Sequence, residues 1–432
     1  MMISGHLGVN FAGHLTVSGV DTVDIAKEYG TPLYVMDEQT IRENLRSLKE
    51  AIDRSCKNGG RVAFASKACS FKEMYRIVAS EGCGTDVVSC GEMYTAKEAG
   101  MPLDRVYFHG NNKTDADLRY ALENGVGRIV VDNFDELRAL EAVAAELNKT
   151  AAILMRVTPG IDAHTHSFIR TGQIDSKFGF TLETGEVYEA VETALSLPHI
   201  DLKGLHCHVA SQIFDEEPMI HAAEVMVGVM VEIKNRFGAT LSELNLGGGF
   251  GIAYTDEDHP KPAHEYMELV GNAVTKTAEN NDFPTPFVIV EPGRSIVAAA
   301  GLTLYTVGGV KRIPNVRTYV SVDGGMTDNP RYALYQAAYT AVLPEKAAAE
   351  PTETVTISGH CCESGDLLQE NVPLPAVKRG DLLAFLTTGA YNYSMSSNYN
   401  RYPKPAVVMV NDGETRVVVR RETFEDVARN DI

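Results

Sequence analysis

A single lysine follows a short apolar stretch near residue 60. Residues 61–70 read RVAFASKACS, so Lys67 stands among small residues at the end of this stretch. A lysine amine can form a Schiff base with a carbonyl group when the protein activates it. The alternative is a surface lysine just past the end of a strand, and the rest of the chain has to decide between the two.

Other polar and glycine residues also follow short apolar stretches. The sequence LNLGGGFG places Gly248 and Gly249 after one of them, and glycines there let backbone N–H groups approach a phosphate closely. A flexible loop is the alternative. The six-residue GxGxxG fingerprint is absent, so the sequence does not predict a dinucleotide site. The remaining candidates are Asp86, Ser89, the segment His109-Gly110-Asn111, Arg156, the segment His206-Cys207-His208 and the segment Glu291-Pro292-Gly293-Arg294.

The segment His206-Cys207-His208 has two interpretations. On a strand, alternation places both imidazoles on one face, which is compatible with a metal pair. We find no third ligand at a suitable spacing, and therefore predict no metal and favour a core or stacking role for one ring.

Glu291 ends the apolar stretch FVIV, and a buried carboxylate needs a partner. That partner is either Arg294 or a protonated ring nitrogen of a ligand. A strand-end lysine, a phosphate-binding glycine loop and a lone carboxylate together fit one cofactor, pyridoxal 5′-phosphate, whose ring accepts electrons when its nitrogen is protonated.

Alternating elements must position these groups. From about residue 60 to 292, eight strand-like stretches alternate with amphipathic helical ones, which predicts a (β/α)8 TIM-like barrel rather than an open doubly wound sheet. The chemistry of such barrels lies at the carboxyl ends of the strands, where all of the candidates fall. The eight stretches are 61–66, 84–89, 105–110, 128–133, 152–157, 202–209, 241–248 and 287–293.

A second, mostly β domain is expected after residue 300, where strand-like stretches follow one another with few helical periods. The first 35 residues contain HLTVSG and TPLYVMD and can join it. We therefore expect an α/β barrel over 36–300 and a β domain formed by 1–35 and 301–432.

Composition excludes several classes of function. The formal net charge of −19 argues against nucleic acid and against an anionic membrane surface as partners. No apolar run approaches the length of a bilayer span, and no secretory signal is evident at the N-terminus. The seven cysteines show no CxxC spacing, so we expect reduced thiols in a cytoplasmic protein.

At the level of whole motifs, the chain resembles the diaminopimelate decarboxylases, of the alanine racemase-like class of pyridoxal-phosphate enzymes. The resemblance covers nearly the whole chain, with Ala210 as a small departure where the family usually has glycine. The motifs, in family order, are FASKACS, HSFIRTGQIDSKFGF, GLHCHVASQIFD, LNLGGGFGIAY, EPGRSIVA, VDGGMTDNPRYALY, CCESGD and GAYNYSMSSNYN.

This resemblance implies decarboxylation of meso-2,6-diaminopimelate to L-lysine and CO2, the last step of lysine biosynthesis. It also implies a homodimer with shared active sites, in which the partner's second domain supplies Cys362 and Glu363. Lys67 is then the residue that holds the cofactor and Cys362 the acid that protonates the product. The implied cofactor-binding residues are Lys67, Asp86, His208, Ser211, Gly248, Gly249, Glu291, Pro292, Gly293, Arg294 and Tyr391. The implied substrate-binding residues are Arg294, Arg331, Tyr335, Glu363 and Tyr391.

Rival functions remain open on the sequence alone. A decarboxylase of ornithine, arginine or carboxynorspermidine would share the fold, as would a racemase, and a non-catalytic decarboxylase-like binding protein is the third alternative. Arg294 and Arg331 favour diaminopimelate, because its distal end carries a carboxylate that two arginines can bind.

Overall fold

The computed structural model describes residues 5–161 and 176–432 and divides into two compact units. The barrel unit comprises Arg42–Ile252 and Pro260–Ser295. The β unit comprises Met1–Ile41, Ala253–His259 and Ile296–Ile432. Residues 166–175, the first part of the motif HSFIRTGQIDSKFGF, lie outside the described residues.

The barrel unit is a closed parallel barrel, as the alternating pattern predicts. The strands pair in the order β9-β11-β12-β13-β5-β6-β7-β8, and a pairing of β9 with β8 closes the ring. The strand β10 (Phe180–Thr181) pairs with the last two residues of β9, Val157 and Thr158, and was not predicted. The eight barrel strands are β5 (Gly60–Ala65), β6 (Gly84–Val87), β7 (Val106–Phe108), β8 (Arg128–Val131), β9 (Ala151–Thr158), β11 (Ile200–His206), β12 (Glu243–Asn245) and β13 (Phe287–Val290).

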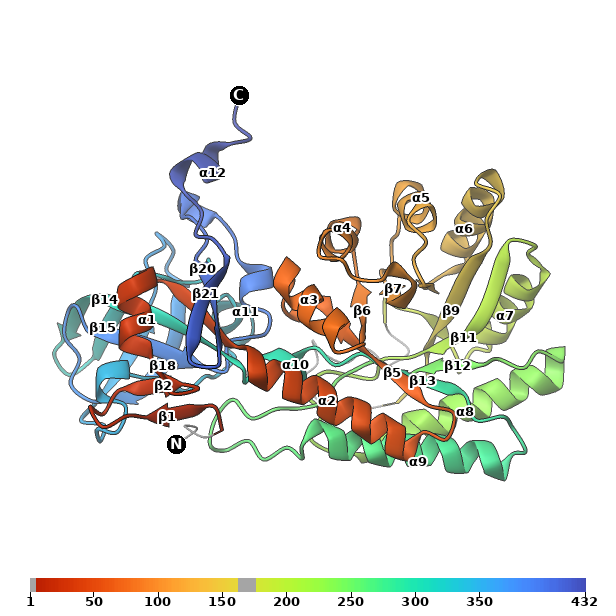
Figure 1. Ribbon diagram of the computed structural model, residues 1–432, viewed down its shortest axis with the longest axis horizontal. Coiled ribbons are helices and arrows are strands. Elements are labelled where there is room, and N and C mark those ends of the chain that lie inside the picture. The colour runs from red at the N-terminus through yellow and green to blue at the C-terminus, as the bar shows by residue number, and fades with distance from the viewer. Residues whose placement is uncertain (1–4, 162–175) are drawn as a thin grey trace. The chain divides into compact units, whose positions relative to one another are not determined.

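A helix follows each of these strands along the chain (Figure 1). Side chains at the helix starts explain where several of them begin, because they accept the first free backbone N–H groups. Ser89 caps α4, Asn133 caps α6, and Thr114 forms a reciprocal capping box with Asp117 at α5. The helices are α3 (Lys72–Ser80), α4 (Cys90–Glu98), α5 (Asp115–Glu123), α6 (Phe134–Glu146), α7 (Glu186–Ser196), α8 (Glu217–Phe237), α9 (Ala263–Asn280) and α10 (Arg294–Val297).

Apolar side chains from five strands fill the barrel. They form one buried cluster, and each of its members is at most 2% exposed: Ala63, Tyr107, Val130, Leu154 and Ile289. Because the interior is packed, any ligand must bind at an end of the barrel.

The β unit is built on a second sheet in the order β18-β17-β15-β14-β4-β20-β21, with β19 paired to β14 and β16 paired to β19. The strand β4 (Leu33–Asp37) pairs with β14 and β20, so an N-terminal strand lies between two C-terminal strands of this sheet. The other strands of this sheet are β14 (Gly301–Ile313), β15 (Arg317–Val322), β16 (Ala341–Val342), β17 (Glu353–Ser358), β18 (Leu367–Leu374), β19 (Leu382–Leu386), β20 (Ala406–Asn411) and β21 (Glu414–Val419).

The remaining elements of the β unit are small. A three-stranded sheet is formed by β1 (Leu7–Val9), β2 (Leu15–Val17) and β3 (Val20–Asp21). The unit's helices are α1 (Thr22–Tyr29), α11 (Arg331–Tyr335) and α12 (Phe424–Ala428), and α2 (Glu38–Ser55) leads from the β unit into the barrel unit.

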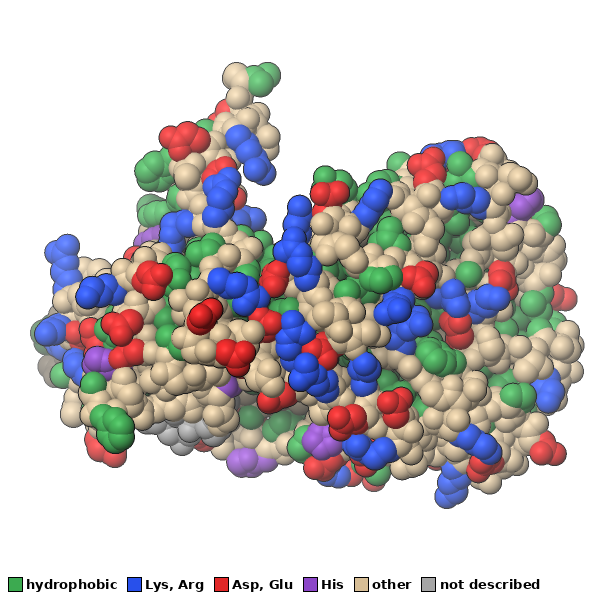
Figure 2. Space-filling model, viewed as in Figure 1, with side chains coloured by type: hydrophobic (Ala, Val, Ile, Leu, Met, Phe, Trp, Pro, Cys, Tyr) green, Lys and Arg blue, Asp and Glu red, His purple; other side chains and the backbone are tan. Residues whose placement is uncertain are grey.

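Acidic and basic side chains are interspersed over the face in view in Figure 2. In the described part of the chain, no helix combines the length and the hydropathy that crossing a bilayer requires.

Candidate active site

Lys67 lies in a 3-10 turn, Ser66–Ala68, directly after β5. Its side chain is exposed, whereas Ser66, Ala68 and Cys69 are buried. The small residues are needed because the loop after β13 packs on this turn: a Cβ on Gly293 would lie 2.9 Å from Cβ of Ala65. The close packing holds the lysine at the carboxyl end of the barrel beside the segment Glu291–Arg294.

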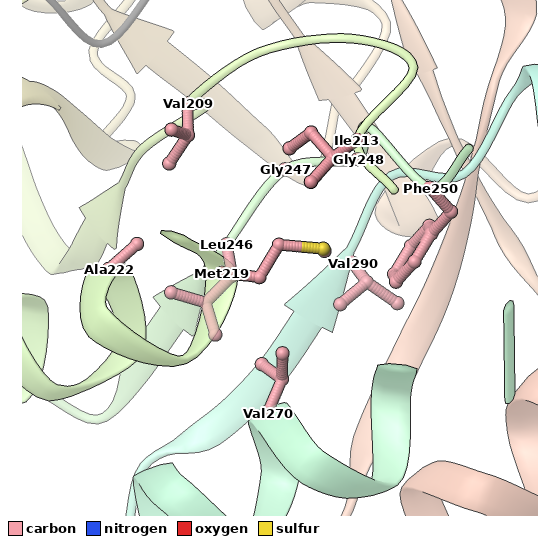
Figure 3. Close-up of a pocket in the computed structure, with 10 residues that line it drawn as sticks. All are labelled: Val209, Ile213, Met219, Ala222, Leu246, Gly247, Gly248, Phe250, Val270 and Val290. Atoms are coloured by element: carbon pink, nitrogen blue, oxygen red, sulfur yellow. The ribbon is translucent and has the colours of Figure 1, made fainter. Parts of the chain in front are cut away.

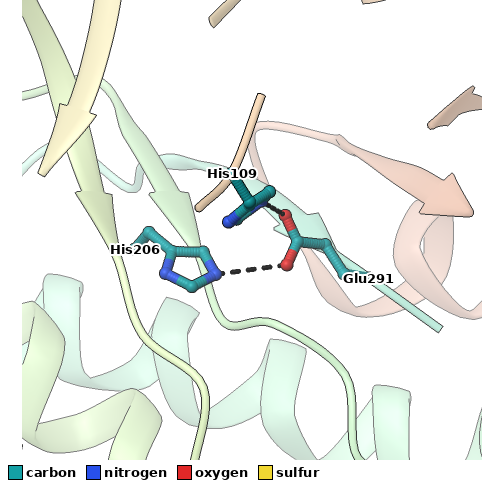
Figure 4. Close-up of side chains that lie close together, drawn as sticks. All are labelled: His109, His206 and Glu291. Atoms are coloured by element: carbon teal, nitrogen blue, oxygen red, sulfur yellow. Dashed lines mark hydrogen bonds and ion pairs between the residues drawn. The ribbon is translucent and has the colours of Figure 1, made fainter. Parts of the chain in front are cut away.

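Glu291 follows β13 and is 8% exposed. Its Oε1 accepts hydrogen bonds from His109 Nε2 and from Asn245 Nδ2, each at 2.7 Å, and its Oε2 accepts one from His206 Nε2 at 3.1 Å (Figure 4). Burial opposes ionisation of this carboxyl, but the two histidines outweigh it and hold the pKa of Glu291 well below its usual range. The alternative pairing of Glu291 with Arg294 is not what the structure contains.

Asp86, on β6, is the second buried carboxyl at this end of the barrel. It is 3% exposed, and its Oδ1 has no hydrogen-bond partner among the described residues. Burial, followed by repulsion from Glu291, raises its pKa well above the usual value, while Lys67 acts in the opposite direction. A buried oxygen without a partner is costly, which indicates that a ligand group completes this site.

The two histidines of the HCH segment do not share a strand face, so that prediction was wrong. The strand β11 ends at His206, where its pairing with β12 stops, and His208 belongs to the following loop. His206 contacts Glu291, whereas Nδ1 of His208 accepts the backbone N–H of Gly248 at 3.3 Å. Burial, followed by the positive charge of Lys67, lowers the pKa of His208, so its ring is a neutral group that can face a ligand.

The glycine loop after β12 has no room for side chains. A Cβ on Gly248 would lie 2.1 Å from the carbonyl oxygen of Glu291, and one on Gly249 would lie 2.3 Å from that of Ala210. Gly249 also has φ +111°, which only glycine adopts readily. Ala210 is buried and is not among the residues with positive φ, so its methyl group does not distort this loop.

An apolar pocket adjoins the glycine loop (Figure 3). Met219 from α8, Val270 from α9 and Val290 from β13 are among its lining residues. These side chains offer no polar group to a ligand. Nearby polar groups come from the loop backbone and from Ser211, whose hydroxyl accepts a hydrogen bond from Arg294 Nη2 at 3.1 Å.

Among the predicted residues of the β unit, Arg331 has the most defined surroundings. Its Nη1 donates to Tyr339 at 2.9 Å and to Tyr254 at 3.2 Å, and the ring of Tyr391 lies 6.0 Å from the guanidinium carbon. Tyr391 has φ +62°, a strained conformation for an aromatic residue. Tyr335, on α11, is 49% exposed.

Cys362 and Glu363 lie on an exposed loop between β17 and β18, while the adjacent Cys361 is buried. The backbone N–H of Cys362 donates to Asn400 Oδ1 at 2.8 Å. Asp366 accepts the N–H groups of Cys361 at 2.7 Å and Met326 at 2.6 Å, so one carboxylate joins this loop to the segment that follows β15.

Several of these partners had no predicted role. Asn245 carried a usable signal, because an amide between two leucines in a buried strand needs a partner. His109 was noted at a strand end, but its contact with Glu291 depends on how the barrel closes. The other residues without a predicted role are Tyr254, Tyr339 and Asp366.

The barrel groups fit pyridoxal 5′-phosphate. The exposed amine of Lys67 suits the aldehyde of this cofactor, and the glycine loop, too tight for Cβ atoms, suits its phosphate. The ionised carboxylate of Glu291 suits the ring nitrogen. The buried Oδ1 of Asp86 lacks a partner that a bound ligand can supply.

Comparison with known proteins identifies the family. Residues 38–298 match the pyridoxal-binding domain of the pyridoxal-dependent decarboxylases. The chain is 50% identical over 433 residues to the diaminopimelate decarboxylase of Bacillus subtilis, covering 100% of this chain and 98% of that one.

Solved structures agree with this. The diaminopimelate decarboxylase of M. jannaschii in complex with L-lysine has a TM-score of 0.92 at 34% identity and covers 100% of this chain and 99% of its own. The lysine/ornithine decarboxylase of Vibrio vulnificus complexed with putrescine has a TM-score of 0.76 at 26% identity, over 90% of this chain and 97% of its own. With full-length identity of this order, and with Lys67, His208, the glycine loop and Glu291 at one end of the barrel, the chain belongs to the diaminopimelate decarboxylase family of pyridoxal-dependent enzymes.

Proposed function

We propose that this protein decarboxylates meso-2,6-diaminopimelate to L-lysine and CO2, the last step of lysine biosynthesis. The observation that carries the proposal is the packing of the Lys67 turn against the loop of Glu291 and Gly293, beside the glycine loop. The names of the full-length relatives support the choice of substrate.

The barrel rim would hold the cofactor. Lys67 supplies the amine for covalent attachment, and Asp86 lies near this linkage. His208 offers a neutral ring for stacking, and Glu291 accepts the N–H of the ring nitrogen. Phosphate and ring contacts come from the residues of three loops, together with one tyrosine: Ser211, Gly248, Gly249, Pro292, Gly293, Arg294 and Tyr391.

Bound at this site, pyridoxal phosphate would supply an electron sink for the electron pair that departing CO2 leaves behind. Glu291 favours this by keeping a negative charge next to the ring nitrogen. Cys362 then delivers a proton to the carbon that lost CO2, and its exposure on the 359–366 loop leaves the thiol accessible for this purpose.

The distal end of diaminopimelate carries a carboxylate and an ammonium group. Arg331 suits the carboxylate because, within the described structure, only its Nη1 makes hydrogen bonds, which leaves its other N–H groups for a bidentate contact. Arg294 assists it, Glu363 binds the ammonium group, and Tyr335 and Tyr391 line the substrate site.

The active enzyme would be a cytoplasmic homodimer. In this proposal, residues 36–300 form the cofactor-binding domain, and residues 1–35 with 301–432 form the domain that completes the partner's site with Cys362 and Glu363. All seven cysteines are free thiols, which suits a reducing compartment.

A decarboxylase of another basic amino acid is the second candidate, since the lysine/ornithine decarboxylase of Vibrio vulnificus shares the fold. CO2 and lysine release from meso-diaminopimelate, measured beside ornithine, arginine and carboxynorspermidine, separates the two. Turnover of diaminopimelate at least tenfold faster than of the others supports the proposal, and a preference for ornithine or arginine refutes it.

The cofactor assignment has its own test. Borohydride reduction of the holoenzyme followed by peptide mapping should find the cofactor on Lys67, and Lys67→Ala should abolish both the label and turnover. A label on another lysine would contradict the assignment.

A further inference from the structure

Glu291 is held by an unusually complete set of neutral donors. Three N–H groups from three different strand ends reach its two oxygens, and all four residues are at most 8% exposed: His109, His206, Asn245 and Glu291. Figure 4 shows both imidazoles directed at the carboxylate, one to each oxygen. Their ring centroids are 4.8 Å apart at an interplanar angle of 65°, so each ring also fixes the orientation of the other.

The number of acceptor positions on Glu291 shows how many further donors its carboxylate can bind. A carboxylate offers about four lone-pair positions, two on each oxygen. Oε1 receives two donors and Oε2 receives one, so a single position on Oε2 remains.

Both imidazoles must donate through Nε2, because an ionised carboxylate can only accept. Nδ1 of His206 is buried without a partner among the described residues, so a proton there would have no acceptor. Burial is also the first cause that lowers the pKa of each histidine, that of His206 to about 4, so both rings are neutral near pH 7.

A metal site is the competing interpretation. One ligand atom from each of His109, His206 and Glu291 lies within 4.8 Å of the others. A metal needs both Nε2 atoms without protons, which would place a proton on Nδ1 of His206, where the described structure offers no acceptor. Since metal-bound histidines normally donate through their second nitrogen, these residues are better suited to donating hydrogen bonds than to binding a metal.

We propose that His109, His206 and Asn245 are positioning residues that orient Glu291 and keep it ionised, so that its one remaining acceptor position faces the ring nitrogen of the cofactor. This inference rests on the proposed function. The other charged groups that act on the histidines and on Glu291 are Arg156 from β9, Lys67 from the turn after β5, and Asp86 from β6. Because these stay in place in the variants below, any change comes from the lost donor.

The test compares two substitutions of His109. His109→Leu removes the donor at similar volume, whereas His109→Gln keeps an N–H donor at a comparable distance from the backbone. The readouts are the absorbance of the bound cofactor as a function of pH, the cofactor dissociation constant, and kcat. A less firmly held Glu291 binds the ring N–H more weakly, so His109→Leu should move the spectral transition to lower pH. It should also reduce kcat by about 10- to 150-fold, the range for a hydrogen bond to a charged group. His109→Gln should recover most of both.

His199→Leu is the matched control. Nδ1 of His199 also bonds a glutamate, Glu141 Oε1, at 2.7 Å in the barrel unit, but at a partly exposed position between α6 and the chain that follows α7. It should change neither the spectrum nor kcat. If His109→Leu does not fold, His206→Leu replaces it, with a smaller shift in the same direction because its bond is 3.1 Å long.

Equal behaviour of His109→Leu and His109→Gln, or a lower melting temperature with an unchanged cofactor spectrum, would show that His109 is merely structural. Borohydride mapping separates this failure from that of the proposed function. If wild-type Lys67 is not labelled, the proposed function fails; if it is labelled and the spectra of the variants match wild type, only the positioning role is wrong.

Discussion

Arg331 shows how a single charge can be held ready for a ligand. Its guanidinium lies 5.2 Å from the ring centroid of Tyr254 and 5.8 Å from that of Tyr339, and both phenols accept from Nη1. Aromatic faces and phenol oxygens stabilise the cation without neutralising it, unlike a carboxylate. The sequence predicted Arg331 from its motif, whereas one of the two tyrosines that accept from it, Tyr254, lies 77 residues earlier in the chain.

We predict that Arg331→Ala lowers kcat/KM for diaminopimelate by about 10- to 150-fold, because a hydrogen bond to a charged group contributes about 1.5–3 kcal/mol. The loss should be mainly in KM if the contact is equally strong in the ground and transition states. Steady-state kinetics on diaminopimelate and on lysine-like substrates that lack the distal carboxylate provide the measurement. Arg317→Ala is the control, since Arg317 also lies by a tyrosine ring, at 5.7 Å, but on an exposed surface. Equal losses on both substrates would mean that Arg331 is structural.

At the scale of elements, the order of the barrel strands was predictable, but their ends were not. All eight strand-like stretches form barrel strands, because buried parallel strands are continuous apolar runs that stand out in sequence. The stretch 202–209 ends as a strand at His206, and 241–248 is paired only over Glu243–Asn245. Polar and glycine residues beyond these points continue the extended chain but leave the sheet to form the rim.

Contacts that depend on tertiary structure could not be predicted. The segment Ala253–His259 belongs to the β unit although barrel segments flank it on both sides. Asn245 and His109 meet at Glu291 only because the closed barrel brings together strand ends that are 136 residues apart in the chain, from His109 to Asn245. A local pattern carries no information about such pairs.

The loop that carries Cys362 is fixed largely by Asp366. This carboxylate is 3% exposed, and a Cβ on Gly359 or on Gly325 would lie 2.2 Å and 2.6 Å from its oxygens. Two glycines therefore make room for one buried carboxylate, which binds the backbone of two loops.

We predict that Asp366→Ala lowers the free energy of unfolding by about 2–4 kcal/mol, because two buried N–H groups lose a charged acceptor. Asp366→Asn, which keeps an acceptor of the same shape, should lose less. Urea denaturation of both variants provides the measurement. Asp258→Ala is the matched control, because Asp258 also accepts two backbone N–H groups but at a partly exposed position. This variant should lower the free energy of unfolding by less than about 1 kcal/mol, because water replaces the lost carboxylate. A loss as small for Asp366→Ala would contradict the role of Asp366 in holding the loop.

At the scale of the whole molecule, one buried carboxyl of the β unit should make stability depend on pH. Asp328 is 2% exposed and accepts hydrogen bonds from Tyr305 and from the backbone of Gly325. Burial raises the pKa of Asp328 from 3.8 to about 7, since these hydrogen bonds only partly offset the loss of water. The folded state therefore holds a proton that the unfolded state releases above about pH 4. The stability that Asp328 contributes is complete below pH 4 and is lost as the pH rises to about 7.

We predict that Asp328→Asn removes this loss. At pH 8 the variant should be more stable than wild type by up to about 4 kcal/mol, at 1.4 kcal/mol for each pKa unit, and at pH 4 the two should be alike. Denaturation curves between pH 4 and 8 measure the difference, with Asp24→Asn, at an exposed position of α1, as the control. A constant difference across this range would show that Asp328 does not titrate there.

Two segments of the β unit expose large apolar side chains, as the proposed dimer would require of an interface. Leu334 and Tyr335 on α11 are 56% and 49% exposed, and Met395 and Tyr399 are 36% and 45% exposed. Large side chains of this kind are enriched at protein interfaces. They come from the same segments that carry Arg331 and Tyr391, so an interface there would place a partner next to residues of the proposed substrate site.

The dimer with shared sites can be tested by complementation. Lys67→Ala and Cys362→Ala should each be inactive as homodimers. In a hybrid, one site combines both changes, whereas the other combines wild-type Lys67 of one subunit with wild-type Cys362 of the other. Random pairing of equal amounts makes half of the dimers hybrid with one working site of two, so the mixture should recover about a quarter of wild-type activity.

Differently tagged subunits, coexpressed and purified on both tags, should recover about half. Pairing Lys67→Ala with Lys67→Arg should recover nothing, because no site then has its lysine. If doubly tagged hybrids of the first pair are isolated and remain inactive, each site is built within one chain, and Cys362 acts on the cofactor of its own subunit or not at all.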